Sequence, residues 1–334
     1  MNKLIKQNIQ WYDKYNFLDF KPYKSGITII IPTYQGEKRI VACIESLINQ
    51  SLPKELFQVI FIINGEKDKT ENIIKDYIQA YDLYNVKIIY HEFANVSVAR
   101  NIGIRTADRE YITFLDDDDF LSSNYLEKMF KYSNLNKVVI SQIADIDESG
   151  TFNYNNKING RIRELEDQPV SMLNPFHSIL SMNACKLIPT YVVKKYRYNP
   201  ELRSGEDVVF FSEMILNENL ELKIIPTNEN AFYFRLIRDQ SISRKREINY
   251  DFNVTQRLKV IAELEYLLSE AKNKEKRENL KMKIRSQVSF IVNYIQLYEN
   301  EIEKVLTDIF RYKLSYFPYN DLYKTFSTEK TIKS

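Results

Sequence analysis

Four consecutive carboxylates stand between apolar residues in the middle of the chain. Asp116, Asp117, Asp118 and Asp119 directly follow a segment, 111–115, that is patterned as a buried strand. Like charges at this spacing repel one another strongly unless a cation neutralises them. Open α/β folds bind their ligands beyond the carboxyl ends of their strands. The run therefore predicts a divalent-metal site at one edge of a sheet. The alternative is an acidic turn ahead of a helix that Ser122 or Ser123 caps.

The metal expected at such a run is Mn²⁺ or Mg²⁺. These hard ions prefer oxygen ligands, and proteins commonly hold them with one or two carboxylates and the phosphates of a substrate. The chain contains only two histidines, which disfavours a histidine-rich zinc site. The open coordination positions of the expected metal suit a diphosphate.

A second group of residues could bind an anion. Residues 95–103 are patterned as the start of a helix, with Asn95 or Ser97 as the cap and Arg100 one turn inside. The free N–H groups of such a helix end favour phosphate. Beside a metal site, this arrangement predicts recognition of a nucleotide. The alternative is an ordinary amphipathic helix that connects two strands.

A third group consists of Glu206 and Asp207, which follow Gly205 at the expected start of another helix. Acidic residues at this place commonly offset the helix dipole. A carboxylate at the mouth of a metal–diphosphate pocket is also what a general base requires. Both interpretations remain open from the residues alone.

The elements that must position these groups alternate between strand and helix. β-branched and apolar runs predict strands, and apolar residues at helical spacing predict the helices between them. The expected strands are 27–32, 59–63, 86–90 and 111–115, and the expected helices are 40–50, 70–78 and 96–106. This alternation indicates an α/β fold with a doubly wound, mostly parallel sheet flanked by helices. Right-handed connections bring the carboxyl ends of the strands to one edge.

The second half of the chain continues this pattern less regularly. Its expected elements are a helix at 123–132, a strand at 138–143, an insertion or long surface hairpin at 147–170, a helix opened by Gly205, and strands at 222–226 and 231–236. We expect a lead-in at 1–25, a catalytic domain at 26–246 that divides into 26–120 and 121–246, and a helical C-terminal module at 247–334. The basic residues of this module predict a solvated surface or contact with an anionic membrane.

The composition excludes several classes of protein. The chain has 334 residues, a net charge of +2 and 44% apolar residues, which is an ordinary globular balance. Bulk charge does not suggest a nucleic-acid partner. The first residues lack the apolar core of a signal peptide, and no apolar stretch is long enough to span a bilayer. We therefore expect a cytoplasmic protein, with peripheral contact at the inner face of the membrane as an extension of that prediction.

Together the motifs resemble those of a known enzyme family. The first strand ends in Pro32-Thr33-Tyr34, the helix carries Ala99-Arg100-Asn101-x-Gly103, and the acid run and Gly205-Glu206-Asp207 follow in order. This set is similar to that of family 2 glycosyltransferases with the GT-A fold, as found in bacterial polysaccharide synthesis. The resemblance covers residues 26–245. It implies transfer of a sugar, with inversion, from a nucleoside-diphosphate sugar to a hydroxyl of a glycan or lipid-linked acceptor.

The resemblance also implies roles for individual residues. Asp118 would be the direct metal ligand with Asp116, Asp207 the general base, and Glu206 the group that orients the acceptor. Asp119 would support the run. The implied donor-binding residues are Pro32, Thr33, Tyr34, Asn64, Glu66, Arg100, Asp116, Asp117, Arg235 and Arg238.

One position departs from the family pattern. The second strand usually ends in an acidic residue that reads the nucleobase, whereas this chain has Asn64, with Glu66 two residues later. An amide can still donate to and accept from a base edge. We therefore still expect a UDP-sugar as the donor. One competing function is that of a nucleotidyltransferase. Such enzymes carry a glycine- and arginine-rich loop after the first strand, and residues 33–39 match that loop poorly. The other is a non-catalytic scaffold of a polysaccharide assembly complex.

Overall fold

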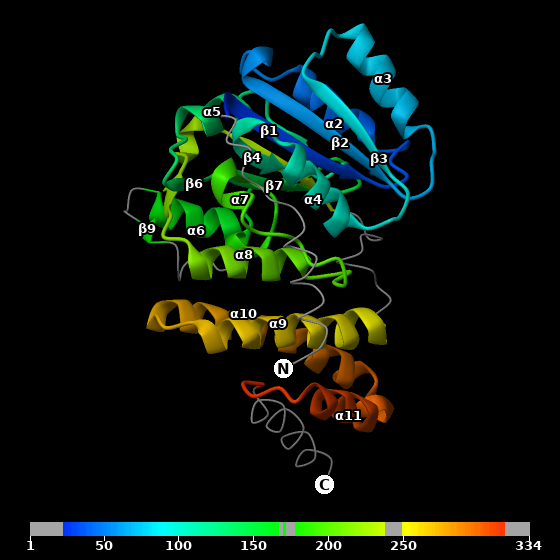
Figure 1. The fold of residues 1–334 in the computed structure, drawn as a ribbon, viewed down its shortest axis with the longest axis vertical. Helices are drawn as coiled ribbons and strands as arrows, with labels where there is room; N and C mark the ends of the chain where they lie inside the picture. The colour runs from blue at the N-terminus through cyan, green and yellow to red at the C-terminus, as the bar shows by residue number, and fades with distance from the viewer. Residues whose placement is uncertain (1–22, 167–169, 172–177, 238–248, 318–334) are drawn as a thin grey trace.

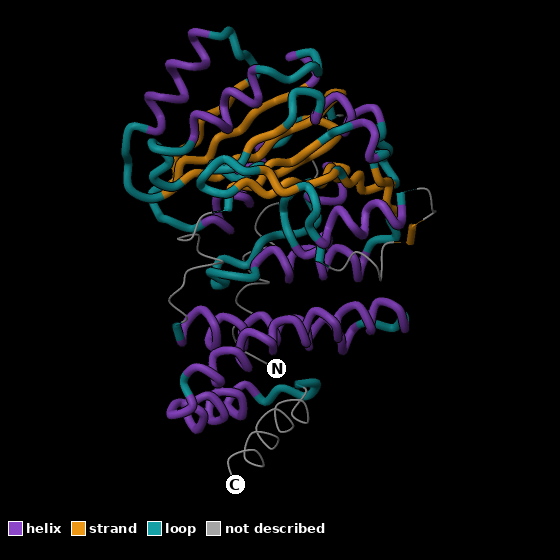
Figure 2. The backbone as a smooth tube through the Cα atoms, turned by 180° about the vertical axis from the view of Figure 1, so that it is seen from behind, coloured by secondary structure: helices purple, strands orange, loops and turns teal. Residues whose placement is uncertain are grey.

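The computed structural model describes residues 23–166, 170–171, 178–237 and 249–317 (Figures 1 and 2). In the view of Figure 1, an α/β part that contains two sheets lies above a layer of C-terminal helices. The expected lead-in at 1–25 lies almost entirely outside the described residues, and so does the expected boundary at 246. The division of the chain at these positions stays a prediction.

The first half of the chain forms the parallel sheet that its apolar runs predict. The strands pair in parallel in the order β3 (Val86–His91), β2 (Phe57–Asn64), β1 (Lys24–Thr33) and β4 (Arg109–Phe114). All eight residues of β2 are buried, which explains why the strand is apolar on both faces. The order reverses between β1 and β4, which places a topological switch point there.

Three helices connect these strands: α2 (Ile40–Ile48), α3 (Thr70–Ala80) and α4 (Val96–Thr106). α2 and α3 pack together on one face of the sheet, and α4 covers the other (Figure 1). α4 begins at the expected cap, because the Asn95 side chain accepts a hydrogen bond from Val98 N at 3.0 Å. Gly103 allows the close approach to the sheet, since a Cβ there would lie 2.4 Å from Ile30 Cγ2.

The sheet extends beyond β4 with antiparallel as well as parallel pairs. Its full order is β3-β2-β1-β4-β10-β6-β11-β9, in which β10 (Lys186–Pro189) runs antiparallel to both neighbours. The remaining strands are β6 (Lys137–Ile140), β11 (Glu221–Ile224) and β9 (Val170–Ser171). The expected α/β class is therefore confirmed, with a mixed outer half to the sheet.

A second, four-stranded sheet lies beside the acid run. It contains, in order, β5 (Phe120–Leu121), β12 (Phe232–Leu236), β7 (Gln142–Ile146) and β8 (Phe152–Asn153). The prediction of one strand at 138–143 is wrong, because the chain passes from one sheet to the other at Ser141. There Ser141 N donates to Cys185 O, and its hydroxyl donates to the carbonyl of Gln142. The polar pair Ser141-Gln142 marks this place in the sequence, but it does not show that the chain enters another sheet.

Residues 147–170 contain more regular structure than the expected insertion or hairpin. β7 and β8 do form a hairpin, and α6 (Lys157–Leu165) follows it. Asn156 caps α6 by accepting from Asn159 N at 2.9 Å. Ile162 is the only fully buried apolar residue of α6, so the helix carries a weak apolar pattern.

The other helices cover the sheets or form the C-terminal layer. They are α5 (Tyr125–Lys131), α7 (Thr190–Val193), α8 (Glu206–Asn217), α9 (Gln256–Glu270), α10 (Lys274–Leu297) and α11 (Ile302–Tyr312). Short 3₁₀ turns occupy Lys54–Leu56, Ile179–Ser181, Thr227–Glu229 and Glu299–Glu301, and a π-helical turn occupies Asp251–Thr255. Within the described ranges, no helix is both long and apolar enough to cross a membrane.

Two hydrophobic cores meet at α8. One core fills the space around the sheets and includes Phe210, Phe211 and Met214 of α8. The other lies among the C-terminal helices and includes Val208 and Val209 of the same helix. The expected helical C-terminal module is thus confirmed. α8 packs both on this module and on the core around the sheets.

Candidate functional site

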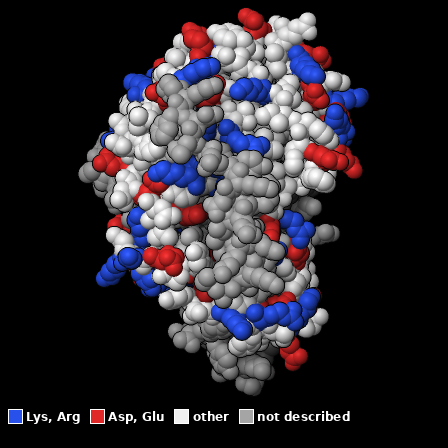
Figure 3. Space-filling model, viewed as in Figure 1, with Lys and Arg blue, Asp and Glu red and all other residues white. Residues whose placement is uncertain are grey.

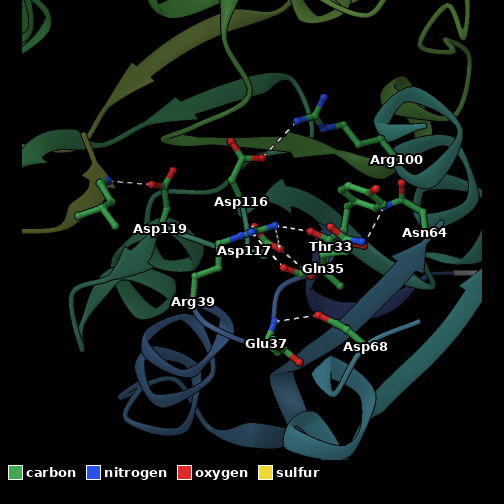
Figure 4. Close-up of polar contacts among 12 residues, drawn as sticks. Thr33, Gln35, Glu37, Arg39, Asn64, Asp68, Arg100, Asp116, Asp117 and Asp119 are labelled. Atoms are coloured by element: carbon green, nitrogen blue, oxygen red, sulfur yellow. Dashed lines mark hydrogen bonds and ion pairs between the residues drawn. The ribbon is translucent and has the colours of Figure 1, made fainter. Parts of the chain in front are cut away.

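The three groups of candidate residues lie at the same edge of the main sheet. Figure 4 shows Arg100 reaching from α4 toward Asp116, while Thr33 and Asn64 lie at the ends of β1 and β2. α8 brings Glu206 to the same place, 2.7 Å from Arg100. The carboxyl ends of these parallel strands therefore gather groups that are far apart in sequence.

Arg100 joins the acid run to the start of α8. Its Nη2 donates to Asp116 Oδ1 at 3.1 Å, and its Nη1 donates to Glu206 Oε1 at 2.7 Å. The guanidinium is 5% exposed and lies 5.4 Å from the centre of the Tyr198 ring. Burial lowers the pKa of Arg100, but the carboxylates of Asp116 and Glu206 raise it by more, so the side chain stays charged. A fixed cation thus separates two acidic groups.

The four acids alternate between buried and partly exposed positions. Asp117 and Asp119 are 7% and 4% exposed, whereas Asp116 and Asp118 are open to solvent in part. The run is not extended chain, because Asp117 and Asp118 form a turn in which Asp119 N donates to Asp116 O at 3.1 Å. The run therefore offers two carboxylates, Asp116 and Asp118, to a ligand.

Asp119 anchors the acid run to the second sheet. Its Oδ1 accepts from Leu236 N at 2.9 Å, and its Oδ2 accepts from the Tyr233 hydroxyl at 2.8 Å. Burial raises its pKa well above the usual range, and the charges of Asp116 and Asp118 add to the shift. The capping alternative is wrong, because α5 starts only at Tyr125, after Asn124, and Asp119 bonds to β12 instead.

Asp117 holds the loop that follows β1. Arg39 grips its carboxylate with Nε at 2.9 Å and Nη2 at 3.1 Å, and the Thr33 hydroxyl donates to it at 2.5 Å. Arg39 also donates to the carbonyls of Tyr34 and Gln35. Both oxygens of Asp117 are thus engaged within the protein. Its implied role in donor binding stays a prediction, and a donor would have to share these oxygens.

The end of β2 is fixed in a similar way. The Asn64 amide donates to Thr33 O at 2.8 Å and accepts from Asn95 N at 2.9 Å. Asn64 therefore ties the end of β1 to the start of α4. Tyr34 is 42% exposed, and its ring packs where a Cβ on Gly65 would lie, at 2.7 Å. Pro32 lies inside β1, and Glu66 is exposed near Gln35. Recognition of a nucleobase by Asn64 or Glu66 stays a prediction.

Asp207 has the properties of a base that works near neutral pH. Burial and the charge of Glu206 raise its pKa to about 7, against the opposing effect of Arg100. Its Oδ1 accepts from Val208 N at 2.8 Å. The turn before it needs glycine, because Gly205 has φ +79°, in the left-handed region. A carboxylate with such a pKa can accept a proton from a hydroxyl and release it again.

The acidic residues suit a metal only in partnership with a substrate. Across the described ranges, no three His, Cys, Asp or Glu side chains lie together as a group that could hold an ion. Two partly exposed carboxylates are what Mg²⁺ or Mn²⁺ needs when phosphate oxygens and water complete the coordination. The residues present therefore fit an ion that binds together with a diphosphate.

Of the two arginines implied to bind the donor, the structure describes Arg235 but not Arg238. Arg235 is paired with Asp145 of β7, at 2.6 Å from Nη2 to Oδ1, so its guanidinium is already engaged. Arg238 lies outside the described residues. A role for either in donor binding stays a prediction.

Sequence reasoning missed three residues that organise the site. Arg39 supports Asp117, Tyr233 supports Asp119, and Tyr198 underlies Arg100. None belongs to a motif, since each acts on a partner at least 78 residues away. Buried acids imply such partners in general terms, because a buried charge needs a counter-charge or hydrogen bonds, but spacing cannot name them.

Comparison with known proteins agrees with this geometry. The family model described as glycosyl transferase family 2 matches residues 28–190. Residues 28–190 therefore belong to glycosyl transferase family 2. The match includes the end of β1, Arg100 and the acid run, and it ends before α8.

Several bacterial relatives of this family 2 member have names from teichoic acid biosynthesis. It is 29% identical over 227 residues to the minor teichoic acid biosynthesis protein GgaB of Bacillus subtilis, covering 66% of this chain and 24% of the relative. It is 23% identical over 340 residues to the poly(ribitol-phosphate) beta-N-acetylglucosaminyltransferase TarP of Staphylococcus aureus, covering 92% and 99%. The chain thus spans about a quarter of the first relative and nearly all of the second.

Solved structures show the same fold. The crystal structure of S. aureus TarS 1–349 matches with a TM-score of 0.63 at 18% identity, covering 88% of this chain and 81% of that one. TarS 1–349 in complex with UDP-GlcNAc matches with a TM-score of 0.61 at 19% identity, covering 81% and 73%. The likeness extends past the sheets, and the expected GT-A fold is confirmed.

Proposed function

We propose that this protein transfers a sugar from a UDP-sugar to a hydroxyl of a polyol-phosphate polymer, with inversion at the anomeric carbon. The names of TarP and TarS as poly(ribitol-phosphate) beta-N-acetylglucosaminyltransferases support UDP-GlcNAc as the first donor to test. The proposal narrows the acceptor predicted from the sequence, a glycan or lipid-linked molecule, to a polymer of the teichoic acid type.

The observation that carries the proposal is the bridge from Asp116 through Arg100 to Glu206. It supports the proposal because Glu206, which directly precedes Asp207, is linked in this way to Asp116 of the acid run, and because burial and the charge of Glu206 raise the pKa of Asp207 to about 7. A donor diphosphate beside Asp116 and Asp118 would thus lie near a carboxylate that can take a proton from an acceptor.

In the proposed reaction Asp207 removes the proton of the acceptor hydroxyl. The acceptor oxygen then forms a bond to the anomeric carbon as the bond from that carbon to the diphosphate oxygen breaks, and the nucleoside diphosphate leaves. Glu206 is held by Arg100 and is therefore fixed in direction, as a residue that orients the acceptor must be. Thr33, Arg39 and Asp117 hold the loop on which the nucleoside would rest.

The proposal includes Mn²⁺ or Mg²⁺ at Asp118 and Asp116. When bound, such an ion neutralises the charge that develops on the leaving diphosphate. Because no group of three or more possible ligands lies together in the described part of the chain, we expect little metal binding without the nucleotide.

The basic C-terminal helices support a solvated surface better than a membrane contact. Lys and Arg side chains are interspersed with Asp and Glu on the face shown in Figure 3. In α10, Arg277 donates to the carbonyls of Leu268 and Ala271, and Lys281 pairs with Glu278. The cytoplasmic location remains a prediction, and contact with the membrane is not part of the proposed mechanism.

The donor can be tested by thermal unfolding and by transfer. Because a ligand that binds only the native state stabilises it by about 2.7 kcal/mol at 100 times its Kd, the true donor should raise Tm clearly. UDP-GlcNAc, UDP-glucose, UDP-GalNAc and GDP-mannose are compared with Mn²⁺ and with EDTA. Transfer is measured as nucleoside diphosphate released and as mass added to purified poly(ribitol phosphate).

We expect one UDP-sugar to raise Tm in a metal-dependent manner and to label the polymer. Stabilisation by a UDP-sugar without any transfer to polyol phosphates would refute the acceptor class. Donor binding that survives EDTA unchanged would refute the metal. If none of the nucleotide sugars binds, the scaffold interpretation replaces an enzyme.

A further inference from the structure

The C-terminal helices hold the segment that carries Glu206 and Asp207 from behind. α9 and α10 run beneath α8 in both views of the backbone (Figures 1 and 2). Val208 and Val209, which directly follow Asp207, belong to the core formed by these helices. The candidate base is thus mounted on a helix whose first turn is packed by the C-terminal module.

α9 contacts the turn at Gly205. A Cβ on this residue would lie 2.8 Å from Val260 Cγ2 and 3.5 Å from Arg257 Nη1, so α9 touches the turn directly. The two residues before Gly205 are also held. Arg203 N donates to Gln256 Oε1 at 3.0 Å, and the Ser204 hydroxyl accepts from Arg257 Nη2. α9 therefore fixes three successive residues just ahead of Glu206.

Arg257 is itself held firmly. It is 4% exposed, its Nη1 donates to Gln287 Oε1 at 2.9 Å, and its Nε donates to Phe252 O at 3.1 Å. The guanidinium also lies 4.5 Å from the centres of the Phe252 and Phe290 rings. An arginine whose three nitrogens are all bonded in a fixed plane transmits position well, because its planar fork loses little further freedom.

The position of Arg257 also affects the electrostatic environment of Asp207. Burial lowers the pKa of Arg257 to about 10, and the charges of Asp207 and Glu206 oppose that shift. The guanidinium is therefore a buried positive charge whose field reaches both acids. A displacement of the turn would change the direction of the Asp207 carboxylate and also its electrostatic environment.

We propose that Arg257 is a positioning residue for transfer: through Ser204 and the close contact of α9 with Gly205, it fixes the turn that directs Glu206 and Asp207. α9 then supports the transfer site through this turn without touching either substrate. This inference rests on the proposed function of Asp207.

Three variants separate positioning from general stability. Arg257→Lys keeps the charge but loses the fork, and Ser204→Ala removes only the hydroxyl that Arg257 contacts. The control is Lys276→Met, because Lys276 Nζ donates to Leu216 O at 2.7 Å and so holds the opposite end of α8 from the same C-terminal module. If Arg257→Lys does not fold, Ser204→Ala carries the test.

We expect Arg257→Lys and Ser204→Ala to lower kcat at least tenfold while the Kd for the UDP-sugar changes less than twofold. The acidic limb of the pH–rate profile should move, because the environment of Asp207 changes. Lys276→Met should lower Tm and leave kcat within twofold. If kcat follows Tm equally in all three variants, or does not fall in Ser204→Ala and Arg257→Lys, the positioning role is refuted.

Hydrogen–deuterium exchange tests the same idea without an assay of activity. Arg257→Lys and Ser204→Ala should speed exchange of the amides at 203–209, whereas Lys276→Met should not. If the native protein transfers no sugar, the proposed function fails, and the exchange result alone decides whether Arg257 fixes the turn. Unchanged exchange in both variants would overturn the inference.

Discussion

Replacing Asp207 by asparagine tests the proposed base through stability as well as through activity. Burial and the charge of Glu206 raise the pKa of this carboxyl from an ordinary value of 3.8 to about 7. The folded state therefore binds the proton of Asp207 more tightly than the unfolded chain does. Between about pH 4 and pH 7 the folded state holds more protons, so stability falls as pH rises through this interval.

The size of this effect follows from the shift. From 3.8 to about 7 is roughly three pKa units, and at 1.36 kcal/mol a unit this corresponds to about 4 kcal/mol as an upper limit. Asp207 is partly exposed, so solvent screens its charge and we expect about 1–2 kcal/mol. Because the amide of the variant cannot ionise, Asp207→Asn should stabilise the protein by this amount above pH 7 and by almost nothing near pH 4.

The assay is thermal unfolding across pH 4–8, together with donor binding and transfer at pH 7.5. A gain of about 1–2 kcal/mol corresponds to a few degrees in Tm for a chain of this size. Donor affinity should stay within twofold of the native value, while transfer falls by about 10²–10⁴ because the base is lost.

Glu213→Gln is the matched control. Glu213 lies on the same helix, and burial and the charge of Glu263 raise its pKa as well. This variant should also gain stability above neutral pH but should keep its transfer rate. A stability of Asp207→Asn that does not depend on pH would refute the raised pKa, and retained transfer would remove Asp207 from the mechanism.

Two further predictions concern the acid run and the loop that it holds. Asp118→Ala should reduce donor binding in Mn²⁺ to the level measured in EDTA by calorimetry, and an undiminished response to Mn²⁺ would remove Asp118 as a ligand. Gly36→Ala would place a Cβ 2.4 Å from Thr33 Oγ1 and 2.9 Å from Asp117 Oδ2, so it should lower stability by about 1–3 kcal/mol and weaken donor binding. Gly160→Ala is its control, because a Cβ there meets no atom within 4 Å, and equal losses in both variants would contradict the reasoning.

Local patterns predict those parts of the fold that local physics decides. The apolar runs of β1 and β2 are buried on both faces, so their sequence alone identifies central parallel strands. Asn95 is confirmed as the cap of α4, because its side chain needs only a neighbouring amide. In contrast, the polar pair Ser141-Gln142 interrupts the apolar residues of 138–143, and only the partners of β6 and β7 show that the chain changes sheet there.

The candidate site divides along the same line. Arg100, Glu206 and Asp116 could be selected from their motifs, and the structure joins them in one bridge. The alternation of burial within the acid run could not be predicted from a strand period, because Asp117 and Asp118 form a turn in which Asp119 N donates to Asp116 O. The partners of the two buried acids, Asp117 and Asp119, could not be predicted either. These partners come from distant elements that no spacing relates to the run.

The shared position of α8 explains why the C-terminal helices matter to the site. One face of α8 packs on the sheet core through Phe210 and Met214, and its first turn packs on the other core through Val208. A base at the start of this helix therefore depends on both cores for its position. Arg100 restrains the turn from the sheet side and Arg257 from the helical side, with Glu206 and Asp207 between them. A change that loosens either side should misdirect the base before it unfolds the protein, because directing a carboxylate requires finer placement than burying a valine does.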